Sequence, residues 1–120
     1  MTDIKTFEDA CAALGINPED FKITYPDKVA HHGKAFAAHV KLVIITEALN
    51  EGWKPDWDNF DEYKYYPWFK MSGGGFAYHD YVNVFTLSYV GSRLVFKTEE
   101  LAEYAAEQFV DIYRDAFVID

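Results

Sequence analysis

Four histidines are the side chains of this sequence best suited to bind a metal: His31, His32, His39 and His79. On a helix, a metal-binding pair is spaced three or four residues apart, so that both rings lie on one face. His32 and His39 are two turns apart instead, which separates them by about 10 Å along a helix axis. On a strand, His79 and Asp80 would point to opposite faces. The sequence therefore predicts no metal site.

An acidic segment at residues 56–62 begins like a calcium loop, with Asp56 and Asp58 one residue apart. The rest of the calcium pattern does not follow. The fifth position is Phe60, the sixth is Asp61 where a glycine is needed, and the twelfth is Pro67 where a glutamate is needed. We interpret the segment as a solvated acidic loop anchored by its neighbouring tryptophans.

Nucleophilic catalysis has little support. Ser72, Ser88 and Ser92 lack the glycine elbow that exposes a catalytic serine. Cys11, the single thiol, lies on the apolar face of a predicted helix and has no basic neighbour to lower its pKa. An acid–base pair stays open, because some of 20 carboxylates will always lie close together. The sequence leans against an enzyme without deciding the matter, and predicts no cofactor.

Composition sets the broad class. The chain has 120 residues, of which 50% are hydrophobic and 18% aromatic, so we expect one folded domain over residues 1–120. A net charge of −9 disfavours nonspecific binding to DNA or to an anionic membrane, and favours a basic partner. One cysteine excludes an internal disulfide, and the first residues lack the apolar core of a signal peptide. On these grounds we expect a cytoplasmic protein.

Helices are predicted in three places. A first helix begins after Thr6 and ends at Gly15, and a short turn begins after Asn17. A central helix covers residues 36–49 and ends near Gly52, before two tryptophans. We expect it to be the most buried element, with Val40, Val43, Ile44 and Ala48 inaccessible. A last helix begins after Thr98 and continues to about residue 117.

Strands are predicted between the central and last helices. Residues 63–71 and 76–81 alternate as the two strands of a hairpin, joined by a glycine turn at residues 72–75. Pro67 favours an edge strand, because it cannot donate to a ladder. Residues 82–90 fit either a further strand or a long loop, and residues 92–97 read as a strand. The expected fold is therefore α+β: a three- or four-stranded antiparallel sheet with the long central helix and the C-terminal helix packed on one face, plus short N-terminal helices.

The outward face of this sheet is the first candidate site. If Leu94 and Phe96 face the helices, then Val95 faces outward with a mixed set of basic and aromatic residues. That set is Lys64, Tyr66, Trp68, Lys70, Arg93 and Lys97. Such a face suits single-stranded nucleic acid, a peptide or an acidic protein surface. It also suits a solvated face with ordinary cation–aromatic packing, and a one-residue slip in the first strand would change its members.

The last helix carries the second candidate site. Five acidic residues recur at every fourth position and form a spiralling ridge: Glu99, Glu103, Glu107, Asp111 and Asp115. Like charges at this spacing destabilise a helix by roughly 0.2–0.5 kcal/mol each. The ridge is either a solvated face that keeps the protein soluble or a site for a basic partner.

Four segments support a resemblance when they are read in order. They are TFEDACAALG at 6–15, KLVIITEALNEGWKPDW at 41–57, YKYYPWF at 63–69 and GSRLVFKTEELAEY at 91–104. They resemble a family of small uncharacterised proteins from Bacteroides-type gut bacteria, their prophages and phages. The resemblance implies a bacterial or phage-related protein, which adds a phage particle as the alternative to a cytoplasmic location. It brings no activity and no functional residues.

These observations favour one function class and leave a second open. The first is a small acidic, phage- or prophage-related protein that acts as a noncatalytic protein-interaction or assembly module. The alternative is a single-stranded nucleic-acid binder that uses the aromatic and basic sheet face. The partner is expected to be a protein, with nucleic acid ranked second and no membrane partner.

Overall fold

The computed structural model describes residues 3–21, 24–71 and 76–119. Within these ranges the chain forms four α-helices, two 3-10 helices and one antiparallel hairpin. The bounds are α1 Phe7–Leu14, 3-10 helices Pro18–Asp20 and Asp27–His32, α2 Gly33–Asn50, β1 Lys64–Lys70, β2 Ala77–Val84, α3 Glu99–Gln108 and α4 Val110–Phe117. The α+β class is confirmed.

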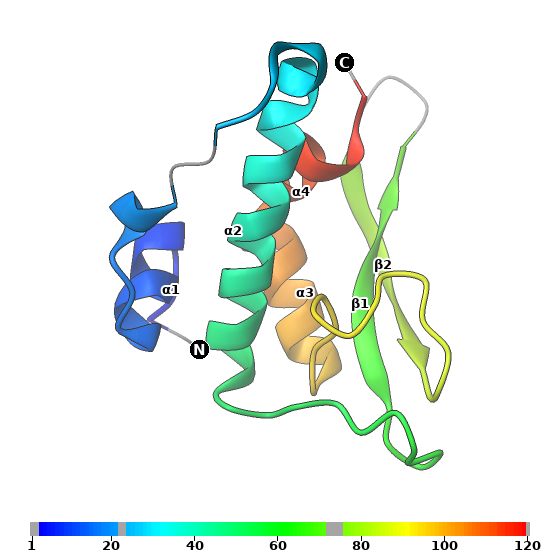
Figure 1. Cartoon of the computed structure of the whole chain (residues 1–120). Helices are drawn as coiled ribbons and strands as arrows, with labels where there is room; N and C mark the ends of the chain where they lie inside the picture. Colours follow the sequence, from blue (N-terminus) through cyan, green and yellow to red (C-terminus); the bar gives the residue numbers. More distant parts are fainter. Residues whose placement is uncertain (1–2, 22–23, 72–75, 120) are drawn as a thin grey trace.

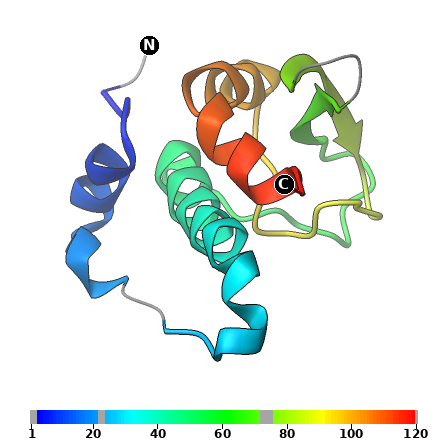
Figure 2. The ribbon, with the colours of Figure 1, turned by 90° about the horizontal axis from the view of Figure 1, so that it is seen from above.

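The elements lie in layers. Viewed from above, α1 lies on one side of α2, α3 and α4 lie on the other side, and the hairpin lies beyond them (Figure 2). One apolar core runs through these layers, and the two strands present one face to the helices (Figure 1). Phe69 of β1 connects hairpin and helices, because its ring centroid lies 4.8 Å from that of Tyr113 and 5.9 Å from that of Phe117. The prediction that a C-terminal helix packs on one face of the sheet is therefore confirmed, whereas the central helix α2 lies behind α3 and α4 and packs mainly against α1 and α4 (Figure 2).

Local signals at the first helix are confirmed. Thr6 accepts a hydrogen bond from the backbone N–H of Asp9, while the Asp9 carboxylate accepts one from the N–H of Thr6. Gly15 ends the helix in the left-handed conformation at φ 70°. Cys11 is buried in the core, as predicted, and this burial raises the pKa of its thiol. The first helix thus covers α2 with its apolar face.

The central helix α2 has seven buried residues, more than any other described element. The predicted set was wrong in part. Ala48 is buried, but Val40, Val43 and Ile44 are only half-buried. The buried set instead contains Ala38, Leu42, Ile45, Thr46, Ala48, Leu49 and Asn50. Residues 42–45 are apolar on all sides of the helix, so their sequence does not select a face; packing against α1 and α4 does.

The hairpin forms as predicted, with a longer second strand. Lys64 pairs with Val84 at one end and Lys70 pairs with Ala77 at the other. A bulge follows Trp68, which opposes Asp80, and the extra residue is His79. The predicted turn at residues 72–75 lies outside the described residues. Of the two alternatives for residues 82–90, the structure has β2 up to Val84 and an irregular loop from Phe85 onward.

The predicted strand at residues 92–97 is wrong, so the described residues contain a two-stranded sheet and not three or four strands. Only Phe96 bridges to the sheet, by hydrogen bonds between its N–H and C=O and those of Tyr65. On the other side of this segment, the buried Asn50 side chain donates to the Val95 carbonyl at 2.9 Å and accepts from the Lys97 N–H at 3.2 Å. Helix α2 therefore occupies the edge where a further strand would pair.

Burial in the same segment departs from strict alternation. Leu94, Val95 and Phe96 are all buried, so the outward orientation predicted for Val95 is wrong. Helix α2 covers one side of the segment and β1 borders the other. Residues 94–96 are therefore shielded from solvent.

The last helix starts as predicted and then breaks. The Thr98 hydroxyl accepts a hydrogen bond from the N–H of Leu101, and Glu99 and Glu100 lie in the first turn. At Phe109 the backbone leaves helical geometry (φ −113°, ψ 28°), which separates α3 from α4. The Phe109 side chain is buried, so the break turns it into the core.

Candidate functional site

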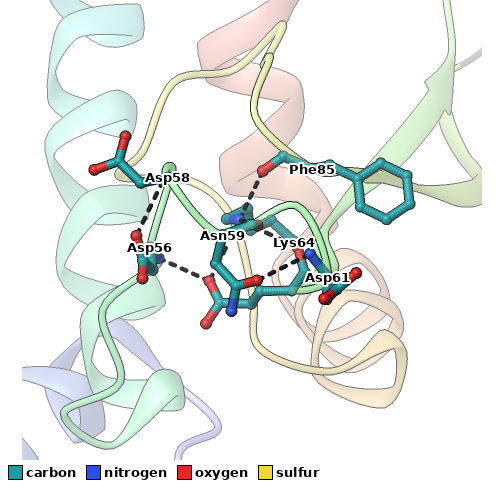
Figure 3. A network of polar contacts seen from close by, with 7 residues as sticks. Asp56, Asp58, Asn59, Asp61, Lys64 and Phe85 are labelled. Atoms are coloured by element: carbon teal, nitrogen blue, oxygen red, sulfur yellow. Dashed lines mark hydrogen bonds and ion pairs between the residues drawn. The ribbon is translucent and has the colours of Figure 1, made fainter.

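Lys64 is fully buried, with 0% of its surface exposed, and it organises one end of the hairpin. Its ammonium group donates hydrogen bonds to the carbonyl oxygens of Phe85 (2.6 Å), Glu62 (3.1 Å) and Asn59 (3.3 Å) (Figure 3). The Glu62 carboxylate adds an ion pair at 3.4 Å. An ammonium has three N–H donors, so all of them are used. We call this arrangement the lysine clasp.

The clasp joins two loops that are separated in sequence, residues 56–62 and residues 85–91. In the first loop, the Asp58 N–H binds the Asp56 carboxylate and the Asp61 N–H binds the Asn59 side chain, which makes two tight turns. In the second loop, the Ser88 hydroxyl accepts hydrogen bonds from the N–H groups of Val90 and Gly91. The acidic loop is therefore ordered by its own side chains and by one lysine.

Large apolar side chains are exposed on these two loops. Leu87 is 82% exposed and Tyr89 is 92% exposed. The rings of Tyr63 and Phe85 contact each other edge to face, with 4.8 Å between their centroids, and both residues remain exposed. We call the set the loop surface; its members are Phe60, Tyr63, Phe85, Leu87 and Tyr89. Exposed apolar groups that gather on one surface mark interaction sites, and the lysine clasp holds these two loops together.

Carboxylates accompany the loop surface. Asp58 and Asp61 are exposed on either side of Phe60 and do not form an ion pair with any described residue. The only cation within the clasp is Lys64, and its charge is directed inward to carbonyl oxygens. The surface therefore combines apolar side chains with negative charge.

The structure separates the six residues of the predicted sheet face. The solvent exposure predicted for Lys64 and Tyr66 is wrong, because Lys64 is buried in the clasp and Tyr66 is only 3% exposed. The loop at residues 85–91 covers this half of β1; the backbone of Phe85 contacts Lys64, and Tyr89 acts electrostatically on Tyr66. Burial is the main cause that raises the pKa of the Tyr66 hydroxyl.

The remaining members of that face lie apart. Trp68 and Lys70 are exposed toward the far end of β1, as predicted. Arg93 is exposed where residues 92–93 border a cavity at the end of α2, and Lys97 is half-buried where its backbone meets Asn50. No single surface carries all six residues.

The break at Phe109 divides the acidic ridge in two. On α3, Glu99 accepts a hydrogen bond from Tyr81 of β2, which is the main cause that raises the pKa of Tyr81 to about 12. Glu103 and Glu107 are exposed beside Tyr78 of the same strand. These three glutamates therefore run along β2.

The second half of the ridge lies on α4. Asp111 is exposed, and Asp115 forms an ion pair with Lys34 of α2 at 3.3 Å. One end of the ridge is thus tied to the sheet and the other to the central helix. In the described part of the chain, four carboxylates of the ridge have no ion-pair partner: Glu99, Glu103, Glu107 and Asp111.

The histidines show no common site. The rings of His31 and His32 lie 4.0 Å apart before α2, while His39 and His79 are exposed on other elements. Among residues 3–21, 24–71 and 76–119, no three His, Cys, Asp or Glu side chains are grouped closely enough to hold a metal ion. The metal prediction therefore depends on experiment.

Lys64 is the residue that the sequence analysis misassigned most. Its position in an alternating strand predicts an outward side chain, while the cage around it consists of backbone carbonyls, which have no sequence signature. Among the residues that the structure describes, Glu62, two positions away, is its only ion-pair partner.

Comparison with known proteins adds no assignment: no family model, curated protein or solved structure matches this chain. Across the described ranges, no helix has both the length and the apolar character needed to cross a bilayer.

Proposed function

We propose that this protein is a noncatalytic interaction module that binds a basic segment of a partner protein through the loop surface. The observation that carries the proposal is the exposure of Leu87 and Tyr89 on a loop that the buried Lys64 fixes in place. An ordered loop loses less conformational entropy on binding than a free one, so its exposed apolar groups are suited to recognition. Exposed aromatic and leucine side chains would supply the apolar centre of such an interface.

Charge supports a basic partner. Asp58 and Asp61 flank Phe60, and the whole chain carries a net charge of −9. Such a field attracts cationic partners and repels anionic ones, which affects the association rate and the choice of partner more than the final affinity. The resemblance to phage and prophage proteins adds a setting to the proposal, in which the module takes part in an assembly or acts on a host protein.

The nucleic-acid alternative has less support. It depends on six residues acting as one platform, but Lys64 and Tyr66 are buried and Arg93 lies elsewhere. Titration of a fluorescent single-stranded oligonucleotide at low salt tests it directly. We expect no change in anisotropy; binding that weakens steeply with salt and with Trp68→Ala would support the alternative instead.

The interaction proposal can be tested with a short synthetic peptide that alternates lysine with leucine. Labelled peptide is titrated with protein and followed by fluorescence anisotropy. Leu87→Ser should weaken binding about tenfold, which corresponds to ~1.4 kcal/mol. The reason is that the substitution removes apolar contact without changing charge.

Two controls separate the loop surface from general attraction. Ile119→Ser removes an equally exposed apolar side chain near the C-terminus, which lies at the other end of the molecule from residues 56–62 (Figure 1). A peptide that alternates lysine with serine carries the same charge without apolar groups. Equal weakening by the two variants, or equal affinity for the two peptides, would show that the loop surface is not the site.

A further inference from the structure

A cavity lies at the C-terminal end of α2, where residues 52–55 and 92–93 also line it. Its volume is about 590 Å³, within the range of small-molecule sites. The indole side chains of Trp53 and Trp57 line it, together with Val43 and Leu14. Walls of this kind suit a flat apolar ring, because aromatic faces stack on one another.

Two residues that line this cavity each hold a buried polar atom with no hydrogen-bond partner in the described structure: the hydroxyl oxygen of Thr46 and the indole N–H of Trp57. Thr46 is only 2% exposed, and both residues line the cavity. Buried polar groups are nearly always paired, so two such atoms at one cavity indicate a site for a polar ligand atom or for water. The hydroxyl can donate or accept, whereas the indole can only donate.

Charged side chains complete the lining. Arg93 and Lys54 are exposed there, and neither forms an ion pair with any residue in the described ranges. The guanidinium of arginine binds a carboxylate in a bidentate manner. Glu47 also lines the cavity, and its charge opposes a ligand with more than one negative group. The lining therefore favours a monoanion.

The lysine clasp supports one wall of the cavity. The Lys64 ammonium lies 5.2 Å from the centre of the Trp57 ring, a distance at which cation and ring attract each other. Because Lys64 is fixed by three carbonyl oxygens, the indole of Trp57 is held in position as well. The cavity thus has a wall that is ordered before any ligand arrives.

We propose that this cavity binds a small aromatic carboxylic acid as its monoanion. The ring lies against Trp53 and Trp57, and the carboxylate pairs with Arg93 and Lys54. A hydroxyl substituent on the ring accepts from the Trp57 indole N–H and bonds to the Thr46 hydroxyl. This site is separate from the loop surface, and the inference does not depend on the interaction proposed above.

Isothermal titration calorimetry with 6-hydroxy-2-naphthoate, and with the neutral 6-hydroxy-2-naphthamide, tests the charge requirement. We expect the carboxylate to bind at least about tenfold more tightly than the amide, as one charge-assisted pair would provide. Arg93→Gln should remove most of that difference, while Lys70→Gln, which removes an exposed cation on β1, should leave it unchanged. Equal affinity for the two probes in the wild-type protein would overturn the proposal.

Thr46→Val tests the polar contact by an independent measurement. The substitution keeps the shape of the side chain and removes an unpaired buried hydroxyl, so the melting temperature of the free protein should stay equal or rise. Binding of 6-hydroxy-2-naphthoate should weaken, and binding of 2-naphthoate, which has no hydroxyl, should not. If both probes weaken equally, or neither binds the wild-type protein, the assignment of this cavity is wrong.

Discussion

The two sides of β1 are held by different kinds of contact. On the helical side, Tyr65 and Phe69 pack against a core formed by α2, α3 and α4. On the other side, Lys64 and Tyr66 lie beneath loops, and the main link is one ammonium group bound to three carbonyl oxygens. Apolar contact is spread over many atoms, whereas the lysine clasp concentrates its stabilisation in one side chain. The first region should therefore tolerate conservative change better than the second.

The largest effect is expected in the core. Ile45 is buried in α2, and truncation to alanine should lower the free energy of unfolding by ~2–5 kcal/mol, as in other packed cores. Its neighbour Ile44 is only half-buried and provides a matched control on the same helix. Urea denaturation of both variants measures the difference. Equal losses would mean that α2 does not bury the face described above.

The lysine clasp comes next. Lys64→Met keeps most of the apolar stem of the side chain but leaves three carbonyl oxygens and Glu62 without their partner, so we expect a loss of about 3 kcal/mol. Lys70→Met removes an exposed lysine from the same strand and should change stability by less than about 0.5 kcal/mol. Hydrogen exchange should also accelerate at residues 56–62 and 85–91 in Lys64→Met alone. A variant as stable as wild type would remove the distinction between the two sides.

Asn50 tests a polar contact inside the helical region. Asn50→Ala leaves the Val95 carbonyl and the Lys97 N–H unpaired, so a loss of ~2 kcal/mol is expected from the burial of those groups. Asn83→Ala, at an exposed position of β2, serves as the control and should be nearly neutral. Thermal denaturation compares the two. A small effect for Asn50 would indicate that residues 94–97 are held by apolar burial alone.

The smallest effect concerns pH. Hydrogen bonding to Glu99 raises the pKa of Tyr81 from 10.0 to about 12 in the folded protein. Because the folded value lies above the unfolded one, this contact stabilises the fold fully below pH 10 and ceases to do so as the pH rises to about 12. Glu99→Gln should lower the pKa of one tyrosine, which is measured by the absorbance of tyrosinate as the pH is raised. The same substitution in a Tyr81→Phe background should have a much smaller effect, and a full-sized shift there would assign the perturbed group elsewhere.

Local signals in the sequence predicted the ends of the elements well. Thr6, Gly15 and Thr98 cap helices as expected, because capping depends on residues three or four positions away. The face of α2 was not predictable in this way, since its apolar run allows several faces and the neighbouring helices select one. The strand expected at residues 92–97 does not form, for a related reason. The side chain of Asn50, more than forty residues earlier, pairs with the Val95 carbonyl and the Lys97 N–H, which a further strand would otherwise bind.

The candidate site was harder to predict than the fold. Alternation in β1 correctly placed Trp68 outward, but it also placed Lys64 and Tyr66 there, because a period of two says nothing about what covers a face. The loop that covers them was one of two alternatives for residues 82–90. Even if that loop were known, its position over β1 depends on hydrogen bonds from Lys64 to main-chain oxygens. Every residue has such an oxygen, so the sequence does not show which ones the lysine will bind.

The lysine clasp has a consequence for the order of folding. Its most distant oxygen, that of Phe85, is 21 positions from Lys64 and follows the end of β2, so the clasp closes only after the hairpin has formed. Contacts formed after the transition state slow unfolding without accelerating folding. Stopped-flow measurements on Lys64→Met should show faster unfolding and an unchanged folding rate; slower folding would mean that the clasp forms early. Under the proposed function, a chain that completes this step last would bind a partner only once its core is closed, and partly folded copies would not compete for that partner.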